Sequence, residues 1–251
     1  MINSKGGSGK TTLATNLASY YAVKEFKTAI IDYDPQGSSL QWLNVRPARL
    51  ARIHGANGAP ARGNSPLHSM KAWIPDEIEV LVIDAPAGVC GLQLKELVRK
   101  SNFIVIPVAP SPIDIRATAA FIKDLLLVGG ALTNKTKIAV VANRVRSRST
   151  TVYVALERFL YSLKLPFLTS ISDSEKYLYA AQTGEGVFEM DDLATAAERQ
   201  ELMPILKWMQ GSFPNRFGVR VDDKFASLES SRKYAAYRTG SFVVNPKAPG
   251  S

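Results

Sequence analysis

Apolar and polar positions alternate in two patterns along most of the chain. Short, nearly continuous apolar runs with the length of buried strands lie at 28–32, 79–84, 103–108, 137–143 and 167–171. Longer segments with the apolar spacing of helices lie at 11–24, 91–100, 113–127, 150–163 and 191–210. Strand and helix segments that follow one another in this way predict an α/β fold, with a mainly parallel twisted sheet and helices on both faces.

Two regions do not follow this alternation. Residues 46–71 are rich in Gly, Pro and Ala and contain four arginines, which favours a mostly irregular surface loop. After residue 211 apolar residues become sparse, and seven basic residues outnumber three acidic ones. We therefore predict a globular domain over 1–211 and a basic, flexible tail over 212–251.

A glycine-rich turn precedes the first predicted helix. Backbone N–H groups in such a turn cradle phosphate oxygens at a helix N-terminus. The residues predicted to bind a nucleotide are Gly6, Gly7, Ser8, Gly9, Lys10, Thr11 and Thr12. Lys10 would reach the β- and γ-phosphates, and the hydroxyl of Thr11 would ligate Mg²⁺. A flexible Gly/Ser linker is the alternative, but the helix and strand that follow are the context that a phosphate-binding loop requires.

Carboxylates follow two of the predicted strands. Asp32 and Asp34 lie in the sequence DYDPQG, and Asp84 ends the apolar run VLVID. At the carboxyl ends of parallel strands these side chains would meet at the phosphate site. We predict that Asp34 orients the attacking water, whereas Asp32 and Asp84 hold the Mg²⁺ shell. A plain turn is the alternative for Asp-Pro-Gln-Gly, and it leaves the two aspartates unexplained.

The glycine-rich loop is similar to a known variant of the phosphate-binding motif. The run NSKGGSGKTT has Ser4 where the general pattern has its first glycine, and it carries an extra lysine, Lys5. It resembles the deviant Walker A motif of the ParA/MinD group of P-loop ATPases. Four later segments resemble that group in the same order, namely the D-x-D-P-Q-G switch, the Walker B strand that ends in Asp84, a P-S-P-x-D turn at 110–114 and a strand that ends in Asn143-Arg144. The group also often places a short strand within the insert at 46–71.

This resemblance implies an activity, cofactors and a quaternary state. It implies an enzyme that hydrolyses ATP to ADP and phosphate with Mg²⁺, in the cytoplasm of a bacterium. It also implies an ATP-dependent homodimer in which Lys5 reaches the phosphates held by the other subunit, so that Lys5, Lys10 and Asp34 serve catalysis. Asn143 would lie on the adenine side of the nucleotide.

The strand that should precede the loop is incomplete in this sequence. Only Met1, Ile2 and Asn3 come before Ser4, whereas a parallel strand usually has about five residues. We therefore expect a truncated first strand. Either a shortened strand survives in the sheet, or the natural protein is longer at its N-terminus.

Composition excludes several classes of protein. A single cysteine, Cys90, excludes a disulfide framework within the chain and the iron–sulfur relatives of this ATPase group. No apolar run approaches the roughly 18 residues that span a membrane. Residues 224–238 lack the continuous apolar face of a membrane-targeting helix, which disfavours the MinD branch.

The net charge of +9 points to an anionic partner. Arg144, Arg146 and Arg148 follow the end of a predicted strand, where they could neutralise DNA phosphates without reading bases. The alternative is an ordinary solvated basic loop. Asp191 and Asp192 stand where the family often carries a basic residue, which weakens the DNA assignment but not the ATPase assignment.

Two functions remain open from the sequence. The first is a ParA-like ATPase that dimerises on ATP, binds nucleoid DNA nonspecifically and positions a plasmid, a chromosome region or other cargo. A ParB-like or other small partner protein would stimulate its hydrolysis. The alternative is an ATP-driven switch of the same family that acts on a protein or envelope complex, in polysaccharide synthesis or conjugation, without DNA.

Overall fold

A computed structural model of the protein describes residues 1–59, 74–127 and 136–211. The chain divides into two units, Met1–Phe213 and Pro214–Ser251. The tail predicted over 212–251 lies outside the described residues, so the following description concerns the first unit.

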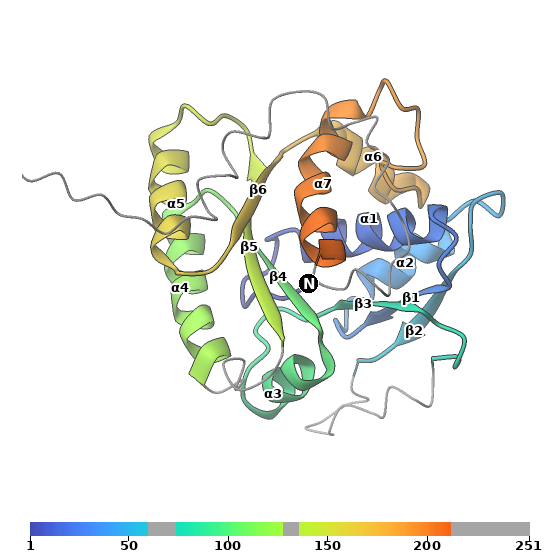
Figure 1. The fold of residues 1–251 in the computed structure, drawn as a ribbon, viewed down its shortest axis with the longest axis horizontal. Helices are drawn as coiled ribbons and strands as arrows, with labels where there is room; N and C mark the ends of the chain where they lie inside the picture. The colour runs from blue at the N-terminus through green and yellow to red at the C-terminus, as the bar shows by residue number, and fades with distance from the viewer. Residues whose placement is uncertain (60–73, 128–135, 212–251) are drawn as a thin grey trace, which may run out of the picture. The chain divides into compact units, whose positions relative to one another are not determined.

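The strands of this unit form two parallel sheets (Figure 1). They are β1 (Thr28–Asp32), β2 (Ile53–Asn57), β3 (Val80–Asp84), β4 (Phe103–Val108), β5 (Lys137–Val145) and β6 (Phe167–Ser172). β1 lies between β2 and β3, and β5 lies between β4 and β6. All four strand pairs are parallel, so the predicted mainly parallel α/β fold is confirmed.

The first three residues lie between the two sheets. The amino group of Met1 donates to the carbonyl of Ile83 in β3 at 2.6 Å, and Ala85 N–H donates back to the carbonyl of Met1 at 3.1 Å. On the other side, Ile2 N–H donates to the carbonyl of Val105 in β4 at 3.2 Å. This short segment therefore occupies the place of the truncated strand and joins β3 to β4.

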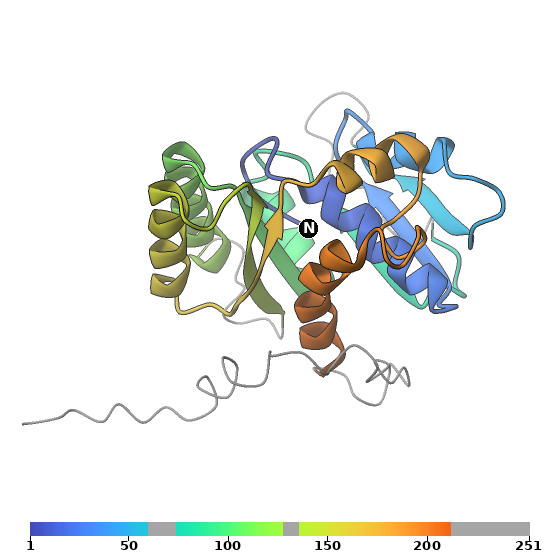
Figure 2. The ribbon, with the colours of Figure 1, turned by 90° about the horizontal axis from the view of Figure 1, so that it is seen from above.

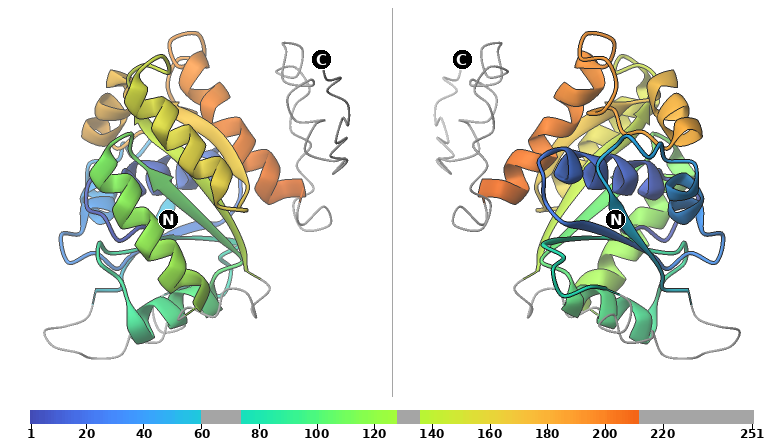
Figure 3. Two further views of the ribbon diagram at one scale, coloured as in Figure 1. Left: turned by 90° about the vertical axis from the view of Figure 1, so that its left-hand side faces the viewer. Right: turned by 90° about the vertical axis from the view of Figure 1, so that its right-hand side faces the viewer.

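Helices cover both faces of the strands, as predicted. They are α1 (Lys10–Val23), α2 (Ser38–Asn44), α3 (Gly91–Lys100), α4 (Pro112–Leu127), α5 (Thr151–Ser162), α6 (Glu175–Thr183) and α7 (Ala196–Gly211). Figure 2 shows α4 and α5 on one side of the strands and α1 and α7 on the other. Figure 3 shows these two layers from their own sides.

Each layer buries its own set of apolar side chains. Leu94 of α3, Leu125 of α4 and Leu156 of α5 share one apolar cluster with Ile106 of β4, and all four are fully buried. Under α1 a second cluster joins the alanines of that helix to Ile30 of β1 and Trp42 of α2. Because both faces of the strands are covered, the strands have continuous apolar sequences instead of alternating ones.

Some elements differ from the sequence prediction. Part of the insert at 46–71, predicted to be mostly irregular, forms β2. Helices α2 and α6 were not predicted, and α7 begins at Ala196 instead of residue 191. The later start of α7 has a local cause, since the carboxylate of Asp191 accepts from Ala194 N–H at 2.8 Å and closes a turn there. None of the described helices combines the length and the apolar character needed to cross a membrane.

Candidate functional site

The glycine-rich loop leads directly into α1. Gly7 and Gly9 have φ values of 75° and 91°, which L-residues with side chains rarely adopt. Gly9 is the N-cap of α1, and no side chain of the described residues caps this helix. Its first-turn N–H groups are therefore left without a side-chain acceptor, and a helix start of this kind can bind phosphate. Gly6 is exposed and Ser8 is buried.

Lys10 and Lys5 are placed differently. Lys10 is buried, and its Nζ donates to the backbone carbonyl of Lys5 at 3.1 Å. Burial lowers the pKa of Lys10, while the charges of Asp84 and Asp34 oppose this shift. The side chain of Lys5 is exposed. The loop thus holds one lysine among the carboxylates and presents the other to the surface.

The two groups predicted to bind Mg²⁺ from the loop and from β3 are in contact. Thr11 Oγ1 donates to Asp84 Oδ2 at 2.7 Å. Burial raises the pKa of Asp84 to about 6, and the hydrogen bond from Thr11 works against this rise. A hydroxyl and a carboxylate at this separation fit Mg²⁺, which favours oxygen ligands and usually completes its octahedron with phosphates and water. Thr12 is half-buried, and its carbonyl accepts from Asn16 Nδ2 at 2.8 Å.

Asp32 and Asp34 organise the segment that follows β1. Asp32 is fully buried, and its Oδ1 accepts from Asp34 N–H at 2.9 Å. Its Oδ2 accepts from the N–H and the hydroxyl of Ser39, at 2.9 and 2.7 Å, so Asp32 holds the start of α2. Its charge also contributes to the raised pKa of Asp84. Asp34 is half-buried, and its Oδ1 accepts from Gln36 N–H at 3.0 Å.

The carboxyl end of β5 contacts the loop. Asn143 is buried, and its Nδ2 donates to the carbonyl of Ser8 at 2.7 Å. A Cβ on Gly9 would lie 1.9 Å from this nitrogen, so the contact requires a glycine. The structure therefore brings Asn143 to the loop, while its predicted position beside adenine stays a prediction.

Asn3 is a buried residue that the sequence motif contains but that sequence reasoning gave no role. Its Oδ1 accepts from Lys5 N–H at 3.2 Å. Its Nδ2 donates to the carbonyl of Pro107 at 2.7 Å and to Thr118 Oγ1 at 3.2 Å. The start of the loop is thereby attached to β4 and α4.

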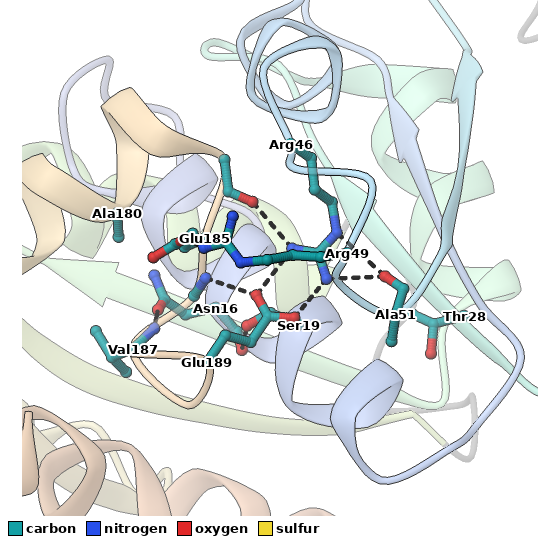
Figure 4. A network of polar contacts seen from close by, with 12 residues as sticks. Asn16, Ser19, Thr28, Arg46, Arg49, Ala51, Ala180, Glu185, Val187 and Glu189 are labelled. Atoms are coloured by element: carbon teal, nitrogen blue, oxygen red, sulfur yellow. Dashed lines mark hydrogen bonds and ion pairs between the residues drawn. The ribbon is translucent and has the colours of Figure 1, made fainter. Parts of the chain in front are cut away.

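A buried network attaches the far end of α2 to the segment after α6 (Figure 4). Arg46 donates to both carboxylate oxygens of Glu189 and, at 2.9 Å, to the carbonyl of Gly184. Its guanidinium lies 5.2 Å from the ring centroid of Trp42, whose Nε1 donates to Ala180 at 3.0 Å. Sequence reasoning missed this network because its partners are far apart in the chain. Helix α2 is therefore fixed at both ends, and the segment before it carries Asp34.

The three predicted DNA-binding arginines follow one another at the carboxyl end of β5, and all are exposed. Arg144 and Arg146 both form ion pairs with Asp173, which lies between β6 and α6. Sequence reasoning did not identify Asp173, because its own neighbours, Ser172 and Ser174, suggest only a turn after a strand.

Comparison with known proteins gives consistent matches. The model of the CobQ/CobB/MinD/ParA nucleotide binding domain matches residues 1–187. Maintenance of carboxysome distribution protein A of Halothiobacillus neapolitanus is 29% identical over 196 residues, which are 76% of this chain and 86% of that protein. Chromosome-partitioning ATPase Soj of Thermus thermophilus is 34% identical over 126 residues, 48% of this chain and 49% of that protein.

A solved structure shows the same fold. It is a putative plasmid partition protein from Borrelia burgdorferi bound to AMPPNP, with a TM-score of 0.63 and 17% identity. The match covers 82% of this chain and 96% of that chain. Another protein of this fold was solved with ADP and magnesium.

Proposed function

This chain belongs to the CobQ/CobB/MinD/ParA family of nucleotide-binding domains, and we propose that it is a ParA-type ATPase that positions a cargo along DNA. The expected ParA/MinD-like P-loop ATPase is confirmed by the family match. ATP and Mg²⁺ as its cofactors are supported by proteins of the same fold that hold AMPPNP or ADP with magnesium. The dimer, the DNA and the cargo are the proposed part.

The loop and the carboxylates divide the chemistry among them. When bound, ATP supplies the phosphoanhydride bond that is broken, and Mg²⁺ neutralises charge on its phosphates. Lys10, which donates to the carbonyl of Lys5 in the structure, would donate to the β- and γ-phosphates instead, because phosphate is the stronger acceptor. Thr11 and Asp84 hold the metal side of the site. Asp34 orients the attacking water, and Asp32 contributes to the metal shell while it fixes the segment that carries Asp34.

ATP-dependent dimerisation completes the site in this proposal. The exposed side chain of Lys5 is available to the phosphates of a second subunit. In the monomer the backbone of Lys5 is held by Asn3, so a lysine is presented from a fixed point of the loop. Nucleotide and partner subunit thus stabilise each other.

One observation carries the extension from ATPase to DNA binding. Asn143 donates to the carbonyl of Ser8 in the nucleotide loop, and the next residue in β5 is Arg144, the first of the exposed arginines. The nucleotide loop (residues 4–10) and the arginine loop (residues 144–148) therefore meet at the same end of β5. We infer that Arg144, Arg146 and Arg148 contact DNA phosphates in the ATP-bound dimer, and that Asn143 lies beside the adenine.

The relatives indicate what such a protein would move. Their names refer to carboxysome distribution and chromosome partitioning. We propose that this chain likewise distributes a cargo over the bacterial nucleoid in the cytoplasm. A ParB-like or other small partner protein on the cargo would stimulate hydrolysis and release the dimer from DNA.

The experiment is retention on duplex DNA with ATP, with ADP and without nucleotide. The parent should be retained only with ATP, and Lys10→Ala should not be retained in any state. Lys123→Ala is a charge-matched control, because Lys123 is exposed on α4 and its removal changes the net charge equally. This control should behave as the parent does.

Two results would count against the proposal. Equal retention in all nucleotide states would show that ATP does not control DNA binding. No retention of the parent with ATP would favour the alternative of a protein or envelope complex as the target.

A further inference from the structure

Two of the three arginines after β5 converge on one carboxylate. Arg144 Nε lies 3.2 Å from Asp173 Oδ1, and Arg146 Nε lies 3.0 Å from Asp173 Oδ2. The two arginine side chains are 54% and 84% exposed, and that of Asp173 is 25% exposed. Each carboxylate oxygen therefore has its own guanidinium, so two surface cations already share one anion.

The position of Asp173 is set by the fold. Its backbone N–H donates to the carbonyl of Val145 at the end of β5, at 3.2 Å. The preceding residue, Ser172, donates from its N–H and its hydroxyl to Glu201 of α7, both at 3.0 Å. The turn that carries Asp173 is thus attached to β5 and to α7. These contacts, and not the arginine side chains, fix the position of the Asp173 carboxylate.

The electrostatics of the cluster agree with a charged carboxylate. The hydrogen bond from Arg146 is the largest cause that lowers the pKa of Asp173, and Arg144 adds to it. At neutral pH, Asp173 therefore cancels part of the positive charge of the loop. An ion pair as exposed as this one contributes little to folding, so stability alone gives a weak reason for it.

We propose that Asp173 is an internal competitor for DNA, whose carboxylate occupies the place between Arg144 and Arg146 that a backbone phosphate takes in the complex. The inference rests on the proposed DNA binding by these arginines. Carboxylate and phosphate accept from guanidinium in similar geometry, so a duplex must displace Asp173 to bind. This competition lowers the DNA affinity of the single arginine loop in a monomer. A dimer binds DNA through two such loops at once, so its affinity is high enough to displace both Asp173 carboxylates.

The test is DNA affinity with ATP for the full chain, measured by anisotropy of a fluorescent duplex. Asp173→Asn keeps the shape of the side chain and removes its charge. Asp124→Asn is the matched control, because Asp124 is exposed in the last part of α4, at the opposite end of the parallel strands, and its removal changes the net charge equally. Asp173→Ser repeats the test without an amide, and thermal unfolding confirms that each variant is folded.

Asp173→Asn should tighten binding by about threefold for one loop, as expected for an exposed ion pair. In a dimer with two loops the gain should be about tenfold. The gain should shrink as salt rises, because salt already screens the pair in the parent. In the background Arg144→Ala and Arg146→Ala, the same substitution should tighten binding no more than Asp124→Asn does.

The outcomes separate this inference from the proposed function. If the parent binds DNA with ATP but Asp173→Asn gains no more than Asp124→Asn, the competitor is wrong and the DNA function stands. An equal gain in the background without the two arginines would also overturn the competitor. If neither the parent nor Asp173→Asn binds any duplex, the DNA function fails, and the inference fails with it.

Discussion

Asp84 and Asp173 both lie at the carboxyl ends of parallel strands, and their surroundings shift their pKa values in opposite directions. Asp84 is 1% exposed, and burial raises its pKa to about 6. Asp173 is at the surface, and two arginines lower its pKa. Ionisation of the buried carboxylate in the nucleotide site is therefore unfavourable, whereas ionisation of the exposed carboxylate beside the arginine loop is favoured by its two ion pairs.

This difference indicates how each region works. A buried carboxylate beside Lys10 is prepared for a cation and for phosphates that replace water, and such sites are commonly where pKa values are most perturbed. Exposed arginines can contact any of the many equivalent phosphates of DNA, and each contact contributes little to the binding free energy. Substitutions in the nucleotide site should therefore abolish ATP binding or hydrolysis, and substitutions in the arginine loop should change DNA affinity by small steps.

The largest effect is expected from Lys10→Ala. Lys10 supplies a compact charge at the phosphates, so ATP affinity should fall by about 100-fold or more. Isothermal titration calorimetry with MgATP measures this, and Lys123→Ala serves as the control. Undiminished ATP affinity in Lys10→Ala would contradict the contrast between the two regions, since loss of a buried lysine would then have no more effect than loss of the exposed Lys123.

Asp34→Ala should separate turnover from binding. Removal of the group that orients the water should slow hydrolysis by at least about 100-fold, while the phosphate cradle and ATP affinity stay intact. The variant should then accumulate as an ATP-bound dimer in sedimentation velocity. Asp76→Ala, which removes an exposed carboxylate elsewhere, should hydrolyse ATP as the parent does. If hydrolysis were unchanged in Asp34→Ala, this residue would lose its proposed role.

The nucleotide site was more predictable from the sequence than the arginine loop. Its residues are consecutive in one loop or end apolar runs, and parallel strands bring such ends together. The contact between Thr11 and Asp84 follows from these two rules. The pairing of Asp173 with Arg144 follows from neither, because the register between β5 and β6 shifts and cannot be read from apolar runs alone.

The missed elements have similar causes. Helix α2 has seven residues, and its start is fixed by the buried carboxylate of Asp32 more than by an apolar stripe. Its end is fixed by Arg46, whose partner Glu189 lies far along the chain. Strand β2 was expected only from the family resemblance, because it falls in a Gly- and Arg-rich insert and pairs with β1 through backbone hydrogen bonds, which any sequence can make. Tertiary contacts decided these elements, and local propensity did not.

A moderate effect is expected when the arginines of the loop are removed. Replacement of Arg144, Arg146 and Arg148 by Ala should weaken binding to any duplex alike. It should flatten the dependence of log affinity on log salt by up to about 0.9 for each lost contact. A control variant removes three exposed basic residues of α3 and α4, namely Lys95, Arg99 and Lys123. Equal slopes for the arginine variant and this control would turn attention to the basic residues after 211.

The smallest effects test the comparison of the two carboxylates through protein stability. The folded-state pKa of Asp84 is raised, so the native protein binds more protons than the unfolded chain between the ordinary pKa and about 6, and stability falls as pH rises through that window. Asp84→Asn should therefore not show this loss, so its stability relative to the nucleotide-free parent should rise by about 1–3 kcal/mol as the pH goes from below the ordinary pKa of an aspartate to 7.

Asp173→Asn should give the opposite sign. The folded-state pKa of Asp173 is lowered, so its contribution to stability is present above the ordinary pKa of an aspartate and is lost as the pH falls through the lowered value. The variant should melt slightly below the parent at pH 7, and the two should converge in acid. Melting curves of parent and both variants over this pH range give the answer. If the stability of both variants relative to the parent changed in the same direction between acid and pH 7, the contrast between a buried, costly carboxylate and a paired surface carboxylate would be wrong.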